Sequence, residues 1–158
     1  MDTYISHSAA QTEALGELWA RSASTGWVIG LCGDLGSGKT RLVKGLARGL
    51  GIPERVHSPS FTLVNVYTGG SMTLFHLDLY RLERPEQILA AGLEEYLDPP
   101  GVTVVEWAER WFGSAPRSQR SLAALPRSNP AQPGLMRWVE IETLSEHTRR
   151  FVYEDIGP

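Results

Sequence analysis

Residues 27–40 read WVIGLCGDLGSGKT, and this stretch predicts the centre of the fold. Residues 27–32 form a short apolar run without polar alternation, which is typical of a strand covered on both faces. Residues 33–40 are rich in glycine, and residues 41–50 place apolar side chains at the spacing of an amphipathic helix. The order of strand, glycine loop and helix predicts an α/β protein whose loop can bind an anion.

The glycine loop fits the phosphate-binding pattern G-x-x-x-x-G-K-[ST] at every fixed position. Glycines let the backbone amides approach phosphate oxygens, Lys39 offers a charge to the β- and γ-phosphates, and Thr40 offers a hydroxyl to Mg²⁺. The dinucleotide pattern G-x-G-x-x-G and the guanine-reading pattern Asn-Lys-x-Asp are both missing, so we expect ATP and Mg²⁺ as ligands. The candidate nucleotide-binding residues of the loop are Asp34, Leu35, Gly36, Ser37, Gly38, Lys39 and Thr40.

Two acidic residues are candidates for completing the Mg²⁺ shell and positioning water, which makes them the candidate catalytic residues. Asp78 lies two residues after His76 in a strand-like segment, so both side chains point to one strand face. Glu106 directly follows a buried apolar strand, and ligands of open α/β sheets bind at such strand ends. Other interpretations stay open: a hydrogen-bonded edge-strand carboxylate for Asp78, a solvated strand end for Glu106, and a transition-metal pair of His76 and Asp78.

A polar segment with Ser60 at its centre follows the first α/β unit. Residues 57–62 read HSPSFT, with Pro59 in the middle. The segment is either a switch loop that reads the γ-phosphate or a connector fixed by the proline, and the residues alone do not separate these two interpretations.

The remaining patterns predict a three-layer α/β P-loop NTPase domain with a mixed central sheet and antiparallel carboxy-terminal strands. Residues 113–134 hold four prolines and no acidic residue, which predicts a flexible loop within a single domain of residues 1–158. The further elements that we expect are helices over 8–24 and 85–97, strands over 61–67 and 72–80 joined by a turn at 68–71, and strands over 135–144 and 148–153.

Composition sets the broad class of the protein. With 158 residues, 42% apolar and 21% charged, the chain is typical of a globular protein, and its net charge of −3 gives no basic excess for binding nucleic acid. No apolar run is long enough for a membrane span, and no signal peptide is visible at the start. Cys32 is the only cysteine, so no internal disulfide can form, and we expect a cytoplasmic protein without membrane contact.

Four ordered blocks resemble one bacterial family, the small TsaE-type ATPases of tRNA threonylcarbamoyladenosine biosynthesis. The blocks are GDLGSGKT at 33–40, SPSFTLV at 58–64, HLDLYRL at 76–82 and VEW at 105–107. The first block is shared by many nucleotide-binding proteins, whereas all four in this order are specific.

The resemblance implies a P-loop ATPase that acts with the threonylcarbamoyl transferase and that enzyme's inactive paralogue. Together they modify the adenosine next to the anticodon in tRNAs reading codons that begin with adenine, and contact with tRNA is expected to be indirect. By matching positions, Thr40 and Glu106 would hold Mg²⁺, Asp78 would position or activate water, and residues 58–62, with Ser60, would be a switch segment. Thr12 matches a family position near the nucleotide base.

The chain departs from the family pattern at two of these blocks. Ser60 stands where the switch block usually has threonine, and Ala108 stands where proline usually follows Glu-Trp. Outside the blocks, residues 113–134 look like a flexible insertion relative to the family. Two other classes of protein stay open. One is a small-metabolite kinase that closes residues 113–134 as an arginine-bearing lid, and the other is a nucleotide-gated binding module without turnover. For the ATPase, we expect weak hydrolysis alone and stimulation by the partners.

Overall fold

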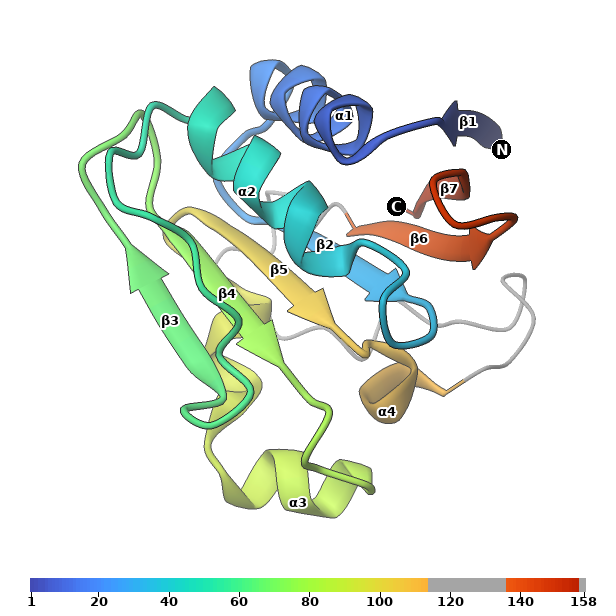
Figure 1. Ribbon diagram of the computed structural model, residues 1–158. Helices are drawn as coiled ribbons and strands as arrows, with labels where there is room; N and C mark the ends of the chain where they lie inside the picture. The colour runs from blue at the N-terminus through green and yellow to red at the C-terminus, as the bar shows by residue number, and fades with distance from the viewer. Residues whose placement is uncertain (114–135, 157–158) are drawn as a thin grey trace.

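A mixed seven-stranded sheet forms the centre of the computed structural model, which describes residues 1–113 and 136–156 (Figure 1). The strands are β1 (Asp2–Ser6), β2 (Trp27–Cys32), β3 (Val64–Tyr67), β4 (Leu74–Asp78), β5 (Val102–Glu106), β6 (Met136–Thr143) and β7 (Arg149–Ile156). Their order in the sheet is β1-β7-β6-β2-β5-β4-β3. The central strands β4, β5, β2 and β6 pair in parallel, whereas β3–β4, β6–β7 and β7–β1 are antiparallel. The expected mixed sheet with an antiparallel carboxy-terminal pair is confirmed.

Helices cover both faces of this sheet and complete the three predicted layers (Figure 1). They are α1 (Ala9–Arg21), α2 (Lys39–Gly49), α3 (Pro85–Ala90), the 3-10 helix η1 (Leu93–Leu97) and α4 (Glu109–Phe112). Leu15 of α1 and Leu42 of α2 join one buried apolar cluster with Ile29 of β2. Ile88 of α3 and Leu93 of η1 belong to a second cluster on the other face. Over the described ranges, no helix has both the length and the apolar character that crossing a membrane requires.

Glycines bring the backbones of α1 and α2 into close contact. A Cβ atom on Gly45 would lie 1.9 Å from the carbonyl oxygen of Glu13, and one on Gly16 would lie 2.4 Å from that of Leu42. Both distances are far below van der Waals contact, so no side chain fits at either position. Because α2 begins at the glycine loop, this contact also fixes the direction in which the helix points at a ligand.

We expect Gly45→Ala to lower the free energy of unfolding by about 1–3 kcal/mol, because the new methyl group must push the two helices apart. Alanine is otherwise the better helix former by about 1 kcal/mol, so without the close contact the substitution would stabilise the protein. Urea denaturation followed by circular dichroism measures the change. Lys44→Ala, on the outer side of the same helix, serves as the control. An unchanged or raised stability of Gly45→Ala would contradict the helix contact.

Several predicted boundaries are wrong, each for a local reason. The strand expected from residue 61 begins only at Val64, because Leu63 has a φ of 68° in the left-handed region and turns the chain. The single helix expected over 85–97 is divided by Gly92, which has a φ of 75°. Strand β1 was not predicted at all. The insertion expected over residues 113–134 lies outside the described residues except for Gly113, so it stays a prediction, as does the single domain.

Candidate functional site

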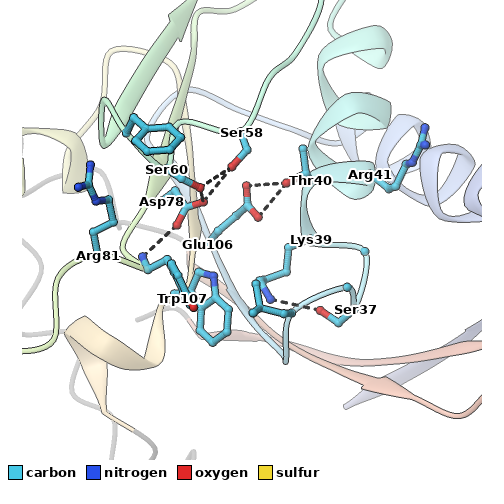
Figure 2. A pocket seen from close by; sticks show the side chains of 15 residues that line it. Ser37, Lys39, Thr40, Arg41, Ser58, Ser60, Asp78, Arg81, Glu106 and Trp107 are labelled. Carbon is cyan, nitrogen blue, oxygen red and sulfur yellow. Dashed lines mark hydrogen bonds between the residues drawn. The ribbon is translucent and has the colours of Figure 1, made fainter.

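The three parallel strands β2, β5 and β4 have their carboxyl ends side by side and place the candidate residues around a common pocket. β2 runs into the glycine loop, while β4 and β5 end at Asp78 and Glu106, which are direct register partners. Figure 2 shows the side chains that line this pocket. Its volume is about 600 Å³. Its lining residues are Leu35, Gly36, Ser37, Gly38, Lys39, Thr40, Arg41, Ser58, Ser60, Phe61, Asp78, Tyr80, Arg81, Glu106 and Trp107. The structure thus brings together residues of all four sequence blocks, from Leu35 in the first to Trp107 in the last.

The glycine loop has the backbone shape of an anion site. Gly36 and Gly38 have φ values of 77° and 101°, in the left-handed region that favours glycine. The Ser37 amide donates to the Asp34 carbonyl at 3.1 Å and closes a turn between them. Gly38 then caps α2 without a side-chain hydrogen bond, so the first amides of this helix are available to an anion.

Lys39 is buried inside this loop, with 5% of its surface exposed. Its Nζ donates to the carbonyl oxygens of Gly33 at 2.5 Å and Asp34 at 2.9 Å, and it lies 4.1 Å from the centre of the Trp107 ring. Burial lowers the pKa of the Lys39 ammonium group, and nearby carboxylates, first of all Glu106, partly offset this effect. The ammonium group is therefore short of solvation and well placed to gain from a phosphate.

Thr40 and Glu106, the two implied Mg²⁺ ligands, are in direct contact. The Thr40 hydroxyl lies 3.1 and 3.2 Å from the two carboxylate oxygens of Glu106 (Figure 2). Glu106 is only 3% exposed, so its interpretation as a solvated strand end is wrong. Its Oε2 also lies 2.5 Å from Nε2 of His76, a contact between residues 30 positions apart that the sequence analysis did not predict.

Asp78 is a buried carboxylate held by the Ser58–Ser60 segment. Its Oδ2 accepts hydrogen bonds from the hydroxyls of Ser58 and Ser60, both at 3.1 Å, and its Oδ1 accepts one from the Tyr80 amide at 2.9 Å. The carboxylate is hydrogen-bonded, but β4 lies between β5 and β3, so it is not at an edge of the sheet. The segment that resembles a switch therefore contacts Asp78, a candidate catalytic residue, directly.

The transition-metal interpretation of His76 and Asp78 gains no support. Within residues 1–113 and 136–156, no three His, Cys, Asp or Glu side chains gather as a metal site. His76 contacts Glu106 instead, while Asp78 binds serine hydroxyls. The oxygen donors of Thr40 and Glu106 fit Mg²⁺, which commonly takes one or two protein oxygens together with phosphates.

Thr12 lies on the other side of the phosphate loop and not in the main pocket. Its hydroxyl is 2.7 Å from that of Ser6, and its methyl group would lie 3.9 Å from a Cβ on Gly38. It borders a second pocket of about 240 Å³, lined by Ser8, Ala9, Thr12, Gly36, Gly38, Arg41, Glu146, His147 and Arg149. Since the two pockets share loop residues, Thr12 can contact a ligand that extends past the loop, and its role near a base stays a prediction.

Arg149 of β7 is a further contact to the loop that the sequence analysis missed. Its Nη2 donates to the carbonyl oxygen of Gly36 at 3.1 Å, and its Nη1 donates to the Ser145 carbonyl oxygen at 2.7 Å in the β6–β7 turn. The guanidinium group therefore ties this turn to the phosphate loop. A separation of 113 residues leaves no local pattern that could have indicated the contact.

Comparisons by sequence found similar proteins of one kind. The family model of TsaE, described as threonylcarbamoyl adenosine biosynthesis protein TsaE, matches residues 6–130. A protein of Nostoc called tRNA threonylcarbamoyladenosine biosynthesis protein TsaE is 51% identical over 100 residues, or 61% of each chain. The protein of the same name from Bacillus subtilis is 47% identical over 98 residues, which are 62% of this chain and 61% of that protein. The chain thus spans about three fifths of the length of these relatives.

A solved structure is similar over nearly the whole chain. It is the crystal structure of YdiB from Bacillus subtilis, with a TM-score of 0.67 and 30% sequence identity. The similarity covers 96% of this chain and 83% of the other. The predicted α/β fold of the P-loop NTPase kind is confirmed.

Proposed function

Because the chain belongs to the TsaE family of threonylcarbamoyl adenosine biosynthesis proteins, we propose that it is an ATP hydrolase required for threonylcarbamoylation of tRNA. It acts on the adenosine next to the anticodon in tRNAs reading codons that begin with adenine, together with the threonylcarbamoyl transferase and its inactive paralogue. One observation carries the proposal: Lys39, Thr40, Asp78 and Glu106 line a single pocket at the phosphate loop. Most of the family match, including all four of these residues, lies in the described part of the chain.

Each of these residues has a role in the proposed reaction. The loop amides and Lys39 bind the β- and γ-phosphates of ATP. Thr40 and Glu106 would hold Mg²⁺, which supplies positive charge to neutralise the phosphate oxygens. Asp78 accepts hydrogen bonds from two hydroxyls on its pocket side, and a water molecule in their place can be oriented toward the γ-phosphate. Ser60 then responds to the nucleotide, because its hydroxyl donates to Asp78 and a change at this carboxylate alters that hydrogen bond.

The rim of the pocket supports the proposed dependence on partners. Phe61 is 86% exposed and Leu35 69% exposed, although both line the pocket. Arg81 lies over the Phe61 ring at 5.2 Å. Apolar side chains around a polar cleft are typical of surfaces that another protein covers. A partner on this rim would shield the nucleotide from bulk solvent, leaving the one reacting water molecule, and would supply transition-state charge. We therefore expect slow hydrolysis by the chain alone.

Reconstituted tRNA modification tests the proposal. The mixture contains the purified transferase and its paralogue, threonylcarbamoyl-adenylate, unmodified tRNA, ATP and this protein. We expect modification over many turnovers only when both the protein and hydrolysable ATP are present. Lys39→Ala should not support it, whereas Lys44→Ala, on the same helix but outside the pocket, should.

Two results would contradict the proposed function. Modification that cycles equally well without the protein would exclude its role in the reaction. Phosphorylation of a small metabolite by the protein alone would instead favour the kinase class, in which no partner is needed.

A further inference from the structure

We infer that His76 is a positioning residue that fixes the carboxylate of Glu106 toward Thr40 and the nucleotide. The imidazole is fully buried in β4, and its Nε2 lies 2.5 Å from Oε2 of Glu106 on the neighbouring strand. Glu106 is itself 3% exposed and contacts the Thr40 hydroxyl with both oxygens. The inference rests on the proposed function, because it assigns His76 a role in the Mg²⁺ site of that function.

The surroundings of the imidazole indicate which nitrogen carries the proton. Nδ1 of His76 is buried and has no hydrogen-bond partner among the residues that the structure describes. A proton on Nδ1 would bury an unpaired N–H and leave the lone pair of Nε2 facing a carboxylate oxygen, and both cost free energy. A proton on Nε2 gives a hydrogen bond to Glu106 and leaves only an unpaired acceptor. His76 therefore donates to Glu106.

This hydrogen bond keeps Glu106 away from a competing partner. Among the nearby carboxylates that raise the pKa of the buried Lys39 ammonium group, Glu106 has the largest effect, so the two groups lie close together. A carboxylate released by His76 can turn toward Lys39 and pair with it. That pairing would withdraw both groups from the nucleotide, one from Mg²⁺ and the other from the phosphates. Residues that orient a metal ligand commonly change metal affinity by about 10- to 100-fold when they are replaced.

Two amide substitutions separate positioning from packing. The side-chain nitrogen of glutamine can occupy the place of Nε2, whereas that of the shorter asparagine reaches only the place of Nδ1. Calorimetry with a non-hydrolysable ATP analogue, in MgCl₂ and in EDTA, gives the factor by which Mg²⁺ strengthens binding. We expect His76→Asn to reduce this factor by about tenfold or more, and His76→Gln to keep it within about threefold of the wild type.

A double-mutant cycle shows whether the effect passes through Glu106. In a Glu106→Gln background, His76→Asn should change the Mg²⁺ factor by less than about twofold, because the ligand that it orients is already lost. Leu77→Ala is the matched control, since it alters the next buried residue of β4, whose side chain points to the other face of the sheet. It should lower stability and leave the Mg²⁺ factor unchanged.

Nitrogen NMR of the histidine rings tests the same inference without a substitution. We expect the His76 ring to carry its proton on Nε2, and the Glu106→Gln variant to shift that nitrogen signal. A proton on Nδ1, equal Mg²⁺ factors for His76→Asn and His76→Gln, or an equal loss in both Glu106 backgrounds would overturn the role of His76. Absence of any nucleotide binding by the wild type is a different result, which would refute the proposed function itself.

Discussion

Lys39→Ala should weaken ATP binding by about 100-fold, which corresponds to the loss of about 3 kcal/mol from a charge-assisted contact. The ammonium group is buried in the loop and is now held by two backbone carbonyls and the face of Trp107. Phosphate oxygens are stronger acceptors than carbonyls, so most of the interaction free energy of this group is gained only when ATP binds. Calorimetric titration with ATP in the presence of Mg²⁺ measures the loss.

The substituted protein should still fold. Burial lowers the pKa of Lys39 below that of a lysine in the unfolded chain. At neutral pH the folded state therefore holds a proton that burial disfavours. The stability cost of this group begins to fall as the pH rises through the lowered pKa, and it is gone above the ordinary pKa of lysine. Alanine removes that cost. Lys44→Ala is the control, and an unchanged ATP affinity of a folded Lys39→Ala protein would contradict the phosphate-loop assignment.

Patterns confined to neighbouring residues predicted much of the fold and the site. The loop at residues 33–40 is flanked directly by its strand and its helix. One continuous stretch of sequence therefore carries the pattern of all three. Glu106 was also predicted from its neighbours, because it directly follows the strand residues VTVV at 102–105. The proximity of Glu106 and Thr40 could not be predicted from neighbouring residues, because 66 residues separate the two. Only the resemblance to a family assigned both residues to one Mg²⁺ site.

Contacts that depend on strand register were beyond the sequence analysis. His76 reaches Glu106 only because β4 and β5 are parallel neighbours, with Asp78 opposite Glu106. The Arg149 contact to Gly36 likewise requires β7 to return beside the loop. Strand β1 was missed because its five residues pair only with β7, near the other end of the chain, and carry no strong local signal. Tertiary pairing, not propensity, forms that strand.

Asp78→Asn should lower the rate of ATP hydrolysis by about 100-fold or more in the presence of the partners, while ATP affinity changes by about threefold or less. The asparagine amide keeps the size of the side chain, and its single oxygen can still accept the two serine hydrogen bonds that Oδ2 of Asp78 accepts. It loses the negative charge that draws a proton from water, so the substitution affects the chemical step more than binding. Phosphate release under saturating ATP measures the rate, and calorimetry measures the affinity.

Glu109→Gln provides the matched control for this change of charge. Glu109 is a second carboxylate that acts electrostatically on Lys39, but it does not line the pocket. If Asp78 contributed only negative charge near Lys39, the two substitutions would slow hydrolysis to a similar extent. We expect the Glu109→Gln rate to stay within about threefold of the wild type, because this side chain does not line the pocket in which the water would be activated. Normal turnover by Asp78→Asn would leave Asp78 with a structural role, that of holding Ser58 and Ser60 in the lining of the pocket by hydrogen bonds.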